Sequence, residues 1–329
     1  MLDQNLPSIS YHLAMNVVIT GAAGFIGSNL LKLLIAKGHT ITPIDNFDAT
    51  LYSKEIKVHN LTATEYQGKI LQNFPTAIPE KSVDQIVHLA ALPGLFEGPN
   101  SVESYTKANV LGTMQMLNFA KLSGAKRVIY ISTSSVYGLS GVGKETIPIK
   151  PISTYGVTKF VGEELVRAHC EENSIEFIIL RLFSVFGPKQ RPDMAIHKIL
   201  FSLLCGETFP VYGNLETERT NTYVSDVCLA ILNSMESKIP NQCYNICGER
   251  KISLRQWIEL AEEVSGRKLK LQNKEARSGE QKITQGDPTR AKSEIGFKNS
   301  ISLEEGLQIQ MEEIMRNLEL YQKLKSSYP

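Results

Sequence analysis

The sequence has almost no net charge and no basic segment. It contains 35 Lys plus Arg against 34 Asp plus Glu in 329 residues, a formal charge of +1. Proteins that bind nucleic-acid backbones usually carry an excess of basic residues, so we expect no nucleic-acid partner. The 42% hydrophobic and 21% charged residues are typical of a globular chain of one large or two smaller domains.

Cysteines are also few, and long apolar runs are absent. The five cysteines are Cys170, Cys205, Cys228, Cys243 and Cys247. They are too scattered, and odd in number, for a disulfide framework, so we expect a reducing, cytoplasmic setting. We interpret Cys243 and Cys247, in the segment QCYNIC, as core residues, because no His or Cys cluster nearby could complete a set of metal ligands. We therefore expect no metal site. No stretch approaches the ~20 apolar residues of a membrane-spanning helix, so we expect no membrane association.

What the sequence does contain is an alternation of β-rich and amphipathic helical segments. We predict strands at 15–20, 39–46, 85–91, 126–133, 175–183 and 242–248, and helices at 25–38, 102–124, 153–173, 196–206, 223–235, 253–264 and 302–323. Such alternation predicts an α/β fold with a Rossmann-like, doubly wound parallel sheet. We expect residues 1–14 to be an N-terminal extension, residues 15–183 plus 223–250 to form the sheet domain, and residues 184–222 plus 251–329 to form a smaller, discontinuous domain.

A glycine-rich turn directly follows the first predicted strand. The segment TGAAGFIG (20–27) spaces Gly21, Gly24 and Gly27 three residues apart. The first glycine permits the tight turn, the second lets the backbone approach a pyrophosphate, and the third lets the helix pack on the sheet. By itself the motif also fits an ordinary tight connection. Asp45 ends the next strand, 24 residues after Gly21, and no arginine stands near it in the sequence. An acid there accepts a ribose hydroxyl and repels a 2′-phosphate, which favours NAD over NADP.

Tyr155 and Lys159 lie four residues apart on a predicted helix and therefore on one face. A phenol with a pKa near ~10 is a poor base at neutral pH, but a nearby ammonium favours the phenolate. The simpler alternative is an amphipathic surface pair. The segment STSSVYG (132–138), which follows a strand, adds hydroxyl groups able to bind the reacting oxygen.

Together these motifs resemble the extended short-chain dehydrogenases/reductases, in particular their NAD-dependent nucleotide-sugar epimerases and dehydratases. The resemblance runs from about Met15 to the end of the chain and implies a catalytic trio of Thr133, Tyr155 and Lys159. It also implies a cofactor site formed by Gly21, Gly24, Phe25, Ile26, Gly27, Asp45, Asn46, Asn60, Leu61, Leu89, Ala90, Ala91, Asn109, Tyr155, Lys159 and Phe183. His88 is interpreted as a structural residue at the end of a strand. Asn60 stands where the family usually has Asp, and can both donate to and accept from adenine.

The resemblance also bears on the reaction. Family dehydratases carry acidic residues after the catalytic Thr, and UDP-glucuronate decarboxylases usually have Glu at position 135; this sequence has Ser134 and Ser135. The loop GPKQRPDMA (187–195) resembles that of UDP-glucuronate 4-epimerases, which assigns Arg191 to the sugar carboxylate. A solvated loop charge is the alternative for Arg191. The expected activity is NAD-dependent 4-epimerisation of UDP-glucuronate to UDP-galacturonate, through a 4-keto intermediate.

Other activities stay open, namely 4-epimerisation of UDP-glucose or UDP-N-acetylglucosamine, decarboxylation of UDP-glucuronate, and NAD binding without turnover. The substrate site implied by the resemblance comprises Thr133, Ser134, Ser135, Tyr155, Ser184, Arg191, Arg219, Arg277 and Glu280. Within it, Arg219 and Arg277 are assigned to the diphosphate. The pattern departs from the family at Thr220 and Asn221, which replace Asp-Phe, and at Glu280, which replaces Asp. The family also implies a homodimer that packs residues 102–123 and 153–172 of two protomers as a helical bundle.

Overall fold

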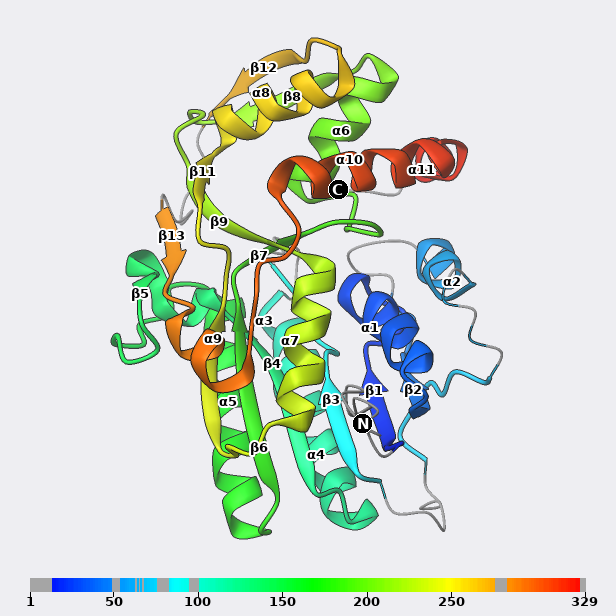
Figure 1. The fold of residues 1–329 in the computed structure, drawn as a ribbon, viewed down its shortest axis with the longest axis vertical. Coiled ribbons are helices and arrows are strands. Elements are labelled where there is room, and N and C mark those ends of the chain that lie inside the picture. The colour runs from blue at the N-terminus through cyan, green and yellow to red at the C-terminus, as the bar shows by residue number, and fades with distance from the viewer. Residues whose placement is uncertain are drawn as a thin grey trace, which may run out of the picture.

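A computed structural model describes residues 14–48, 54–62, 64, 66, 68–75, 83–94, 101–275 and 283–325. In Figure 1 a parallel sheet flanked by helices fills the lower part of the view, and a group of helices and short strands lies above it. The sheet strands are β1 (Asn16–Thr20), β2 (Thr40–Ile44), β3 (Gln85–His88), β4 (Arg127–Thr133), β6 (Glu176–Leu182) and β10 (Gln242–Ile246).

The sheet has the doubly wound order β10-β6-β4-β3-β1-β2, and all its pairings are parallel. Beyond β2, a single parallel bridge joins Ile44 to Leu71. If this bridge is counted as a further strand beside β2, the strand order is that of the Rossmann fold. The expected fold class is therefore confirmed. The order in which strands are added to the sheet reverses between β1 and β3, and such folds bind ligands at this point, at the carboxyl ends of the strands.

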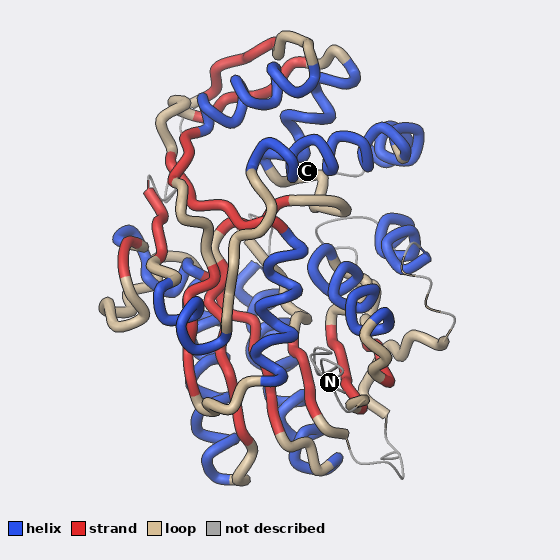
Figure 2. The backbone as a smooth tube through the Cα atoms, viewed as in Figure 1, coloured by secondary structure: helices blue, strands red, loops and turns tan. Residues whose placement is uncertain are grey.

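Helices cover both faces of the sheet (Figure 2). The helices α1 (Phe25–Ala36) and α7 (Val224–Glu236) pack on the face that carries Val17 and Ile19. On the opposite face, α4 (Gly112–Ser123) and α5 (Thr154–Glu172) pack near Val18. Successive strand residues point to opposite faces, so the three central residues of β1, Val17, Val18 and Ile19, are all apolar because both faces of the strand are buried.

The predicted helix at 102–124 is interrupted in the structure. It consists of α3 (Ser101–Tyr105), a π-helical segment η1 (Thr106–Leu111) and α4. Helix α4 ends at Gly124, whose φ of 68° lies in the left-handed region that glycine adopts readily. Short π segments inside helices are frequent at functional sites, and this one carries Asn109.

Most of the remaining elements lie in the upper part of Figure 1 or at its junction with the sheet. The remaining elements are α2 (Lys54–Thr62), η2 (Ser134–Ser140), β5 (Val142–Gly143), β7 (Ser184–Phe186), α6 (Ala195–Cys205), β8 (Thr208–Tyr212), β9 (Glu218–Tyr223), β11 (Lys251–Ser253), α8 (Leu254–Ser265), β12 (Lys270–Lys274), β13 (Ile283–Gly286), α9 (Thr289–Ile295), α10 (Leu303–Arg316) and α11 (Leu318–Leu324). A second apolar core around Phe186 and Trp257 holds α6, α8 and α10 together. Helix α9 instead packs against β10 of the large sheet, although its residues belong to the segment 251–329 that we predicted to lie in the smaller domain.

Within the residue ranges given at the start of this subsection, no helix has the length and apolar character required to cross a membrane. In the same ranges, no group of three or more His, Cys, Asp or Glu side chains is arranged to hold a metal ion.

Candidate active site

The glycine turn lies between β1 and α1, at the carboxyl edge of the sheet. Gly21 has a φ of 70°, and a Cβ there would lie 2.8 Å from the backbone nitrogen of Ala90. A Cβ on Gly27 would overlap the carbonyl oxygen of Gly21. Gly24 is the N-cap of α1 and has no side chain to cap the first turn, which contains no acidic residue. The amides at the start of α1 are thus arranged to receive an anion.

The residues present fit a dinucleotide with a pyrophosphate and an adenine. Asp45 is buried, and its carboxylate accepts hydrogen bonds from the backbone nitrogens of Ala23 (2.9 Å) and Phe47 (2.8 Å). Asn60 donates through Nδ2 to the carbonyl oxygen of Ala23 (3.3 Å), while its buried Oδ1 has no hydrogen-bond partner in the described part of the chain. An unpaired buried acceptor is costly, and the amino group of an adenine would satisfy it. Asn60 therefore suits the adenine site, although the family usually has Asp there.

The other residues assigned to the cofactor lie around the same edge. Leu89, Ala90 and Ala91 directly follow β3 and are half-buried, and the nitrogen of Ala90 donates to Oγ1 of Thr20 (3.2 Å). The remaining members are Phe25 and Ile26 at the start of α1, the exposed Asn46 after β2, Leu61 on α2, and Phe183 between β6 and β7. Phe183 packs against Tyr137 in a small apolar cluster. The cofactor contacts of these residues stay predictions.

The structure brings the three predicted catalytic residues together. Thr133 ends β4, and Tyr155 and Lys159 lie on the first two turns of α5. The N-cap of α5 is Ser153, whose Oγ accepts the backbone N–H of Gly156, which fixes where this helix begins. The Thr133 side chain hydrogen-bonds Tyr155, and its Oγ1 also accepts the N–H of Ser135 (3.1 Å). The Thr133 hydroxyl thus adjoins the phenol, and it also donates a hydrogen bond to Oγ of Ser135 (3.2 Å).

Burial and charge shift the pKa values of Tyr155 and Lys159, the two side chains predicted to be catalytic. Burial raises the pKa of Tyr155, and the hydrogen bond to Thr133 and the positive charge of Arg191 counteract this rise. Burial lowers the pKa of Lys159 to about 7, while the charge of Glu163 opposes that shift. The Lys159 ammonium lies 4.2 Å from the centre of the Tyr130 ring. A phenol and an ammonium with shifted pKa values, at the end of a sheet that carries a dinucleotide turn, mark a site for proton transfer.

His88 and Asn109 support this site from behind. Both ring nitrogens of His88 face hydroxyl groups, those of Thr20 (2.8 Å) and Thr113 (3.3 Å), and burial lowers the pKa of His88 to about 3. The ring is therefore neutral and forms hydrogen bonds at both nitrogens, which agrees with the structural role expected for His88. The Asn109 side chain hydrogen-bonds both the N–H and the C=O of Leu92. It therefore joins the π-helical segment to the chain that follows β3.

The sequence analysis did not identify a buried ion pair behind the catalytic helix. Glu163, one turn after Lys159, accepts hydrogen bonds from Nε (2.9 Å) and Nη2 (2.7 Å) of Arg181 and from Oγ of Ser132 (2.5 Å). The two charged side chains are 0% and 3% exposed. An arginine inside the apolar strand IEFIILRLF was the signal in the sequence, because such a charge is buried only with a partner.

Among the residues predicted to bind substrate, Arg191 lies within electrostatic range of Tyr155, since its positive charge lowers the pKa of that phenol. Its Nε and Nη2 donate to the two carboxylate oxygens of Asp193 at 2.9 and 2.6 Å, and Nη1 lies 3.5 Å from the carbonyl oxygen of Pro93. The alternative of a solvated loop charge at Arg191 is therefore wrong, because the guanidinium is mostly buried. Asp193 engages one edge of Arg191, which the sequence analysis did not foresee.

The other predicted substrate residues lie on neighbouring elements. Ser134 is buried and Ser135 half-buried at the start of η2, while Ser184 on β7 is half-buried and pairs in register with Asn221 on β9. Arg219, also on β9, donates through Nη1 to the carbonyl oxygen of Glu218 (2.9 Å). Arg277 and Glu280 lie outside the described residues. The substrate roles of all these residues stay predictions.

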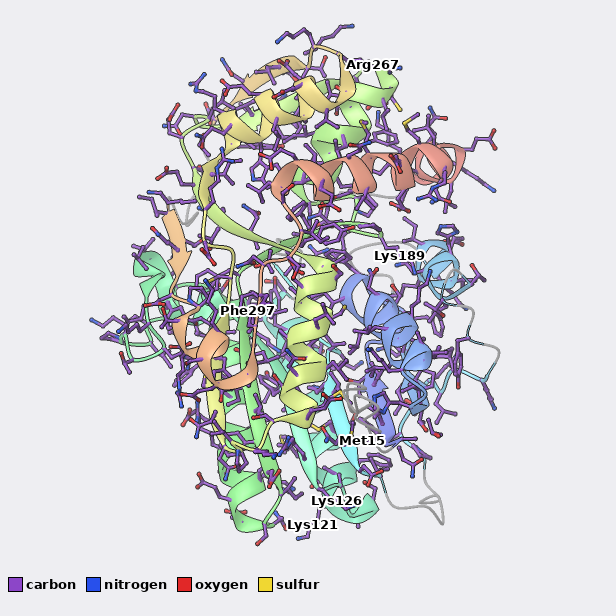
Figure 3. The ribbon with its side chains drawn as sticks, viewed as in Figure 1. Met15, Lys121, Lys126, Lys189, Arg267 and Phe297 are labelled. Carbon is purple, nitrogen blue, oxygen red and sulfur yellow. The ribbon has the colours of Figure 1, made fainter. Side chains whose placement is uncertain are left out.

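The loop that carries Arg191 is tied to the cofactor side. Nζ of Lys189 donates to the carbonyl oxygen of Asn60 (2.8 Å), and Nδ2 of Asn29 on α1 donates to the carbonyl oxygen of Pro188 (3.1 Å). Figure 3 shows Lys189 at the junction between the sheet part, near α2, and the helices above it. Sequence reasoning missed this link, because Lys189 and Asn60 are 129 residues apart.

Comparison with known proteins agrees with this geometry. Residues 17–247 match the NAD dependent epimerase/dehydratase family. A UDP-glucuronate 4-epimerase of Thermodesulfobacterium geofontis is 28% identical over 94% of this chain and 98% of its own length. An uncharacterized UDP-glucose epimerase of Bacillus subtilis is 34% identical over 89% of this chain and 96% of its own length.

Solved structures show the same relationship. The UDP-glucuronic acid 4-epimerase of Bacillus cereus, crystallised with UDP-glucuronic acid and NAD, superposes with a TM-score of 0.85 at 31% identity, over 92% of this chain and 99% of that one. A UDP-glucose 4-epimerase of Thermotoga maritima gives a TM-score of 0.82 at 28% identity, over 92% and 100% of the two chains. The chain belongs to the NAD dependent epimerase/dehydratase family, and its cofactor is NAD.

Proposed function

We propose that the protein is an isomerase that interconverts UDP-glucuronate and UDP-galacturonate by inverting C4. The observation that supports this proposal is that the positive charge of the mostly buried Arg191 guanidinium acts on the phenol of Tyr155. A cation there would meet the C5 carboxylate of a glucuronyl group whose C4 hydroxyl lies at the phenol. The similarity to UDP-glucuronate 4-epimerases supports the same assignment.

The residues of the chain supply proton transfer and orientation. When bound, NAD would supply reversible hydride transfer at C4 of the sugar, with removal from one face and return to the other. The Tyr155 phenolate takes the proton of the C4 hydroxyl and gives it back after inversion, and Thr133 hydrogen-bonds the phenol. The Lys159 ammonium favours the phenolate, and Arg191 would hold the carboxylate so that the intermediate β-keto acid keeps its carbon dioxide.

A second candidate is 4-epimerisation of a neutral UDP-hexose. The specific observation in its favour is the ion pair of Arg191 with Asp193, which offsets the charge that a substrate carboxylate would meet. A glucuronyl carboxylate would then have to bind another edge of the guanidinium or displace Asp193. A neutral sugar makes no such demand.

Incubation with UDP-glucuronate, UDP-glucose and UDP-N-acetylglucosamine, with products identified by NMR, separates these candidates. We expect UDP-galacturonate from UDP-glucuronate, no net reduction of NAD, and no turnover in Tyr155→Phe, which removes the acid–base hydroxyl. Arg191→Ala should weaken UDP-glucuronate turnover far more than NAD retention. Turnover of neutral sugars alone would support the second candidate, and release of UDP-xylose would identify a decarboxylase.

We also propose that the protein is a homodimer. The outer faces of α4 and the neighbouring segments carry exposed apolar side chains, among them Val102, Leu111, Met114 and Val157. The helices that carry them pack side by side in each protomer. Exposed apolar patches mark association surfaces, and these helices correspond to the family bundle. Light scattering after size-exclusion chromatography should give twice the 36.6 kDa chain mass, and Leu111→Glu should give the monomer.

Two further assignments complete the proposal. The five cysteines are free thiols in the structure, which supports a reducing, cytoplasmic location. We assign cofactor binding to residues 15–183 plus 223–250 and substrate binding to residues 184–222 plus 251–329. The positions of the glycine turn and of Arg191 support this division, and limited proteolysis with and without UDP-sugar would test it.

A further inference from the structure

We propose that Lys57 on α2 offsets the rejection of a 2′-phosphate at Asp45, so that the cofactor site binds NADP as well as NAD. The sequence contains the acid that selects NAD but shows no cation beside it. The fold supplies that cation from a helix that begins nine residues after Asp45. The proposal concerns cofactor choice and does not depend on which sugar the protein uses.

The pair is well defined geometrically. Nζ of Lys57 lies 3.0 Å from Oδ1 of Asp45, and the two side chains are 11% and 3% exposed. The opposite oxygen of Asp45 accepts the N–H of Ala23 in the glycine turn. Helix α2 therefore places a positive charge at the point where the adenosine ribose meets the end of β2. Because water is largely excluded, the two charges act on each other and on a ligand with little screening.

Charge decides which dinucleotide such a site accepts. An acid at the end of the second strand accepts the ribose 2′-hydroxyl, whereas a neighbouring cation accommodates the 2′-phosphate of NADP. Asp45 alone would repel that phosphate, but the Asp45–Lys57 pair has no net charge. The other charged side chains at the start of α2, Lys54 and Glu55, are exposed to solvent and act more weakly.

Removing Lys57 should therefore change NADP binding more than NAD binding. Asp45 keeps its hydrogen bonds from the N–H groups of Ala23 and Phe47 when the lysine is lost, so the ribose acceptor stays in place for NAD. The 2′-phosphate, in contrast, would face an uncompensated carboxylate. Lys57→Gln keeps a polar side chain of similar length without the charge, and Lys57→Arg keeps the charge.

A competition experiment on the purified full-length protein tests this. The protein is incubated with equimolar NAD and NADP until the bound ratio is the same from either starting nucleotide, and released nucleotides are quantified by chromatography. We expect the bound NADP to NAD ratio to fall about tenfold in Lys57→Gln, which corresponds to ~1.4 kcal/mol, and to be kept in Lys57→Arg. Lys54→Gln, the matched control on the exposed face of α2, should leave it unchanged.

Several outcomes would overturn the proposal. An unchanged ratio in Lys57→Gln would show that the lysine does not act on the 2′ position. Equal loss of both nucleotides would reduce Lys57 to a structural role, and absence of bound NADP from the wild-type protein would show that Asp45 still excludes it. If Lys57→Gln fails to fold, a changed ratio in Lys57→Arg decides against a role for the charge. None of these results bears on the sugar specificity.

Discussion

Replacing Glu163 by Gln should destabilise the protein and lower the pKa of Lys159, the lysine that we propose to be catalytic. The carboxylate of Glu163 accepts two hydrogen bonds from Arg181 and one from Ser132, and neither charged partner is exposed by more than 3%. A glutamine carries no charge and presents an N–H₂ group where Arg181 needs an acceptor. The arginine would then be a buried cation without its counter-ion.

The size of the effect follows from this burial. Loss of one partner from a buried ion pair costs about 3–5 kcal/mol, because the remaining charge stays desolvated. At about 2 °C per kcal/mol for a chain of this size, the melting temperature should fall by roughly 6–10 °C. Since the charge of Glu163 raises the pKa of Lys159, its removal should also lower that pKa below its value of about 7.

Differential scanning calorimetry measures the first effect, and NMR of isotope-labelled lysine side chains measures the second. The matched control is Glu164→Gln, the next residue on α5, whose side chain is 56% exposed and forms an ion pair with Arg167 on the helix surface. We expect less than about 0.5 kcal/mol for this control. The double variant Glu163→Leu/Arg181→Met should recover part of the loss, because it removes both charges. A decrease in melting temperature of less than about 2 °C in Glu163→Gln would refute the reasoning.

Three further predictions concern the turn, the catalytic lysine and the loop. Gly27→Ala should weaken NAD retention and lower the melting temperature, because its Cβ would overlap the carbonyl oxygen of Gly21; retained NAD at unchanged stability would contradict this. Lys159 has a folded pKa of about 7 against 10.5, so the folded state binds fewer protons and its stability rises with pH between these values. Denaturant titrations should therefore show the stability advantage of Lys159→Met over the wild type shrink by about 2–3 kcal/mol from pH 7 to pH 9, and a constant difference would count against a buried cation. Lys189→Met should cost about 1–2 kcal/mol and raise the KM for the UDP-sugar, because it breaks the hydrogen bond to Asn60; an unchanged KM would show that this link does not position the loop.

Local patterns in the sequence determined much of the fold. Apolar runs of strand length and amphipathic segments of helix length predict the β1, α1, β4, α5 and β6 elements to within about two residues, because side-chain periodicity and end signals such as Gly124 act over a few neighbours. The short strands of the upper part were not predicted. Strands of two to six residues that pair over long distances leave little periodic signal.

The candidate site divides in the same way. The sequence by itself determined the glycine turn, the acid at the end of β2, and the Tyr155–Lys159 pair, since each motif is a short spacing whose chemistry follows from its residue types. The tertiary structure alone decided which charges face these groups. It placed Lys57 on Asp45, Glu163 on Arg181, and Asp193 on Arg191 in the substrate loop. Electrostatic energies depend on distance and burial, and only the folded chain fixes both.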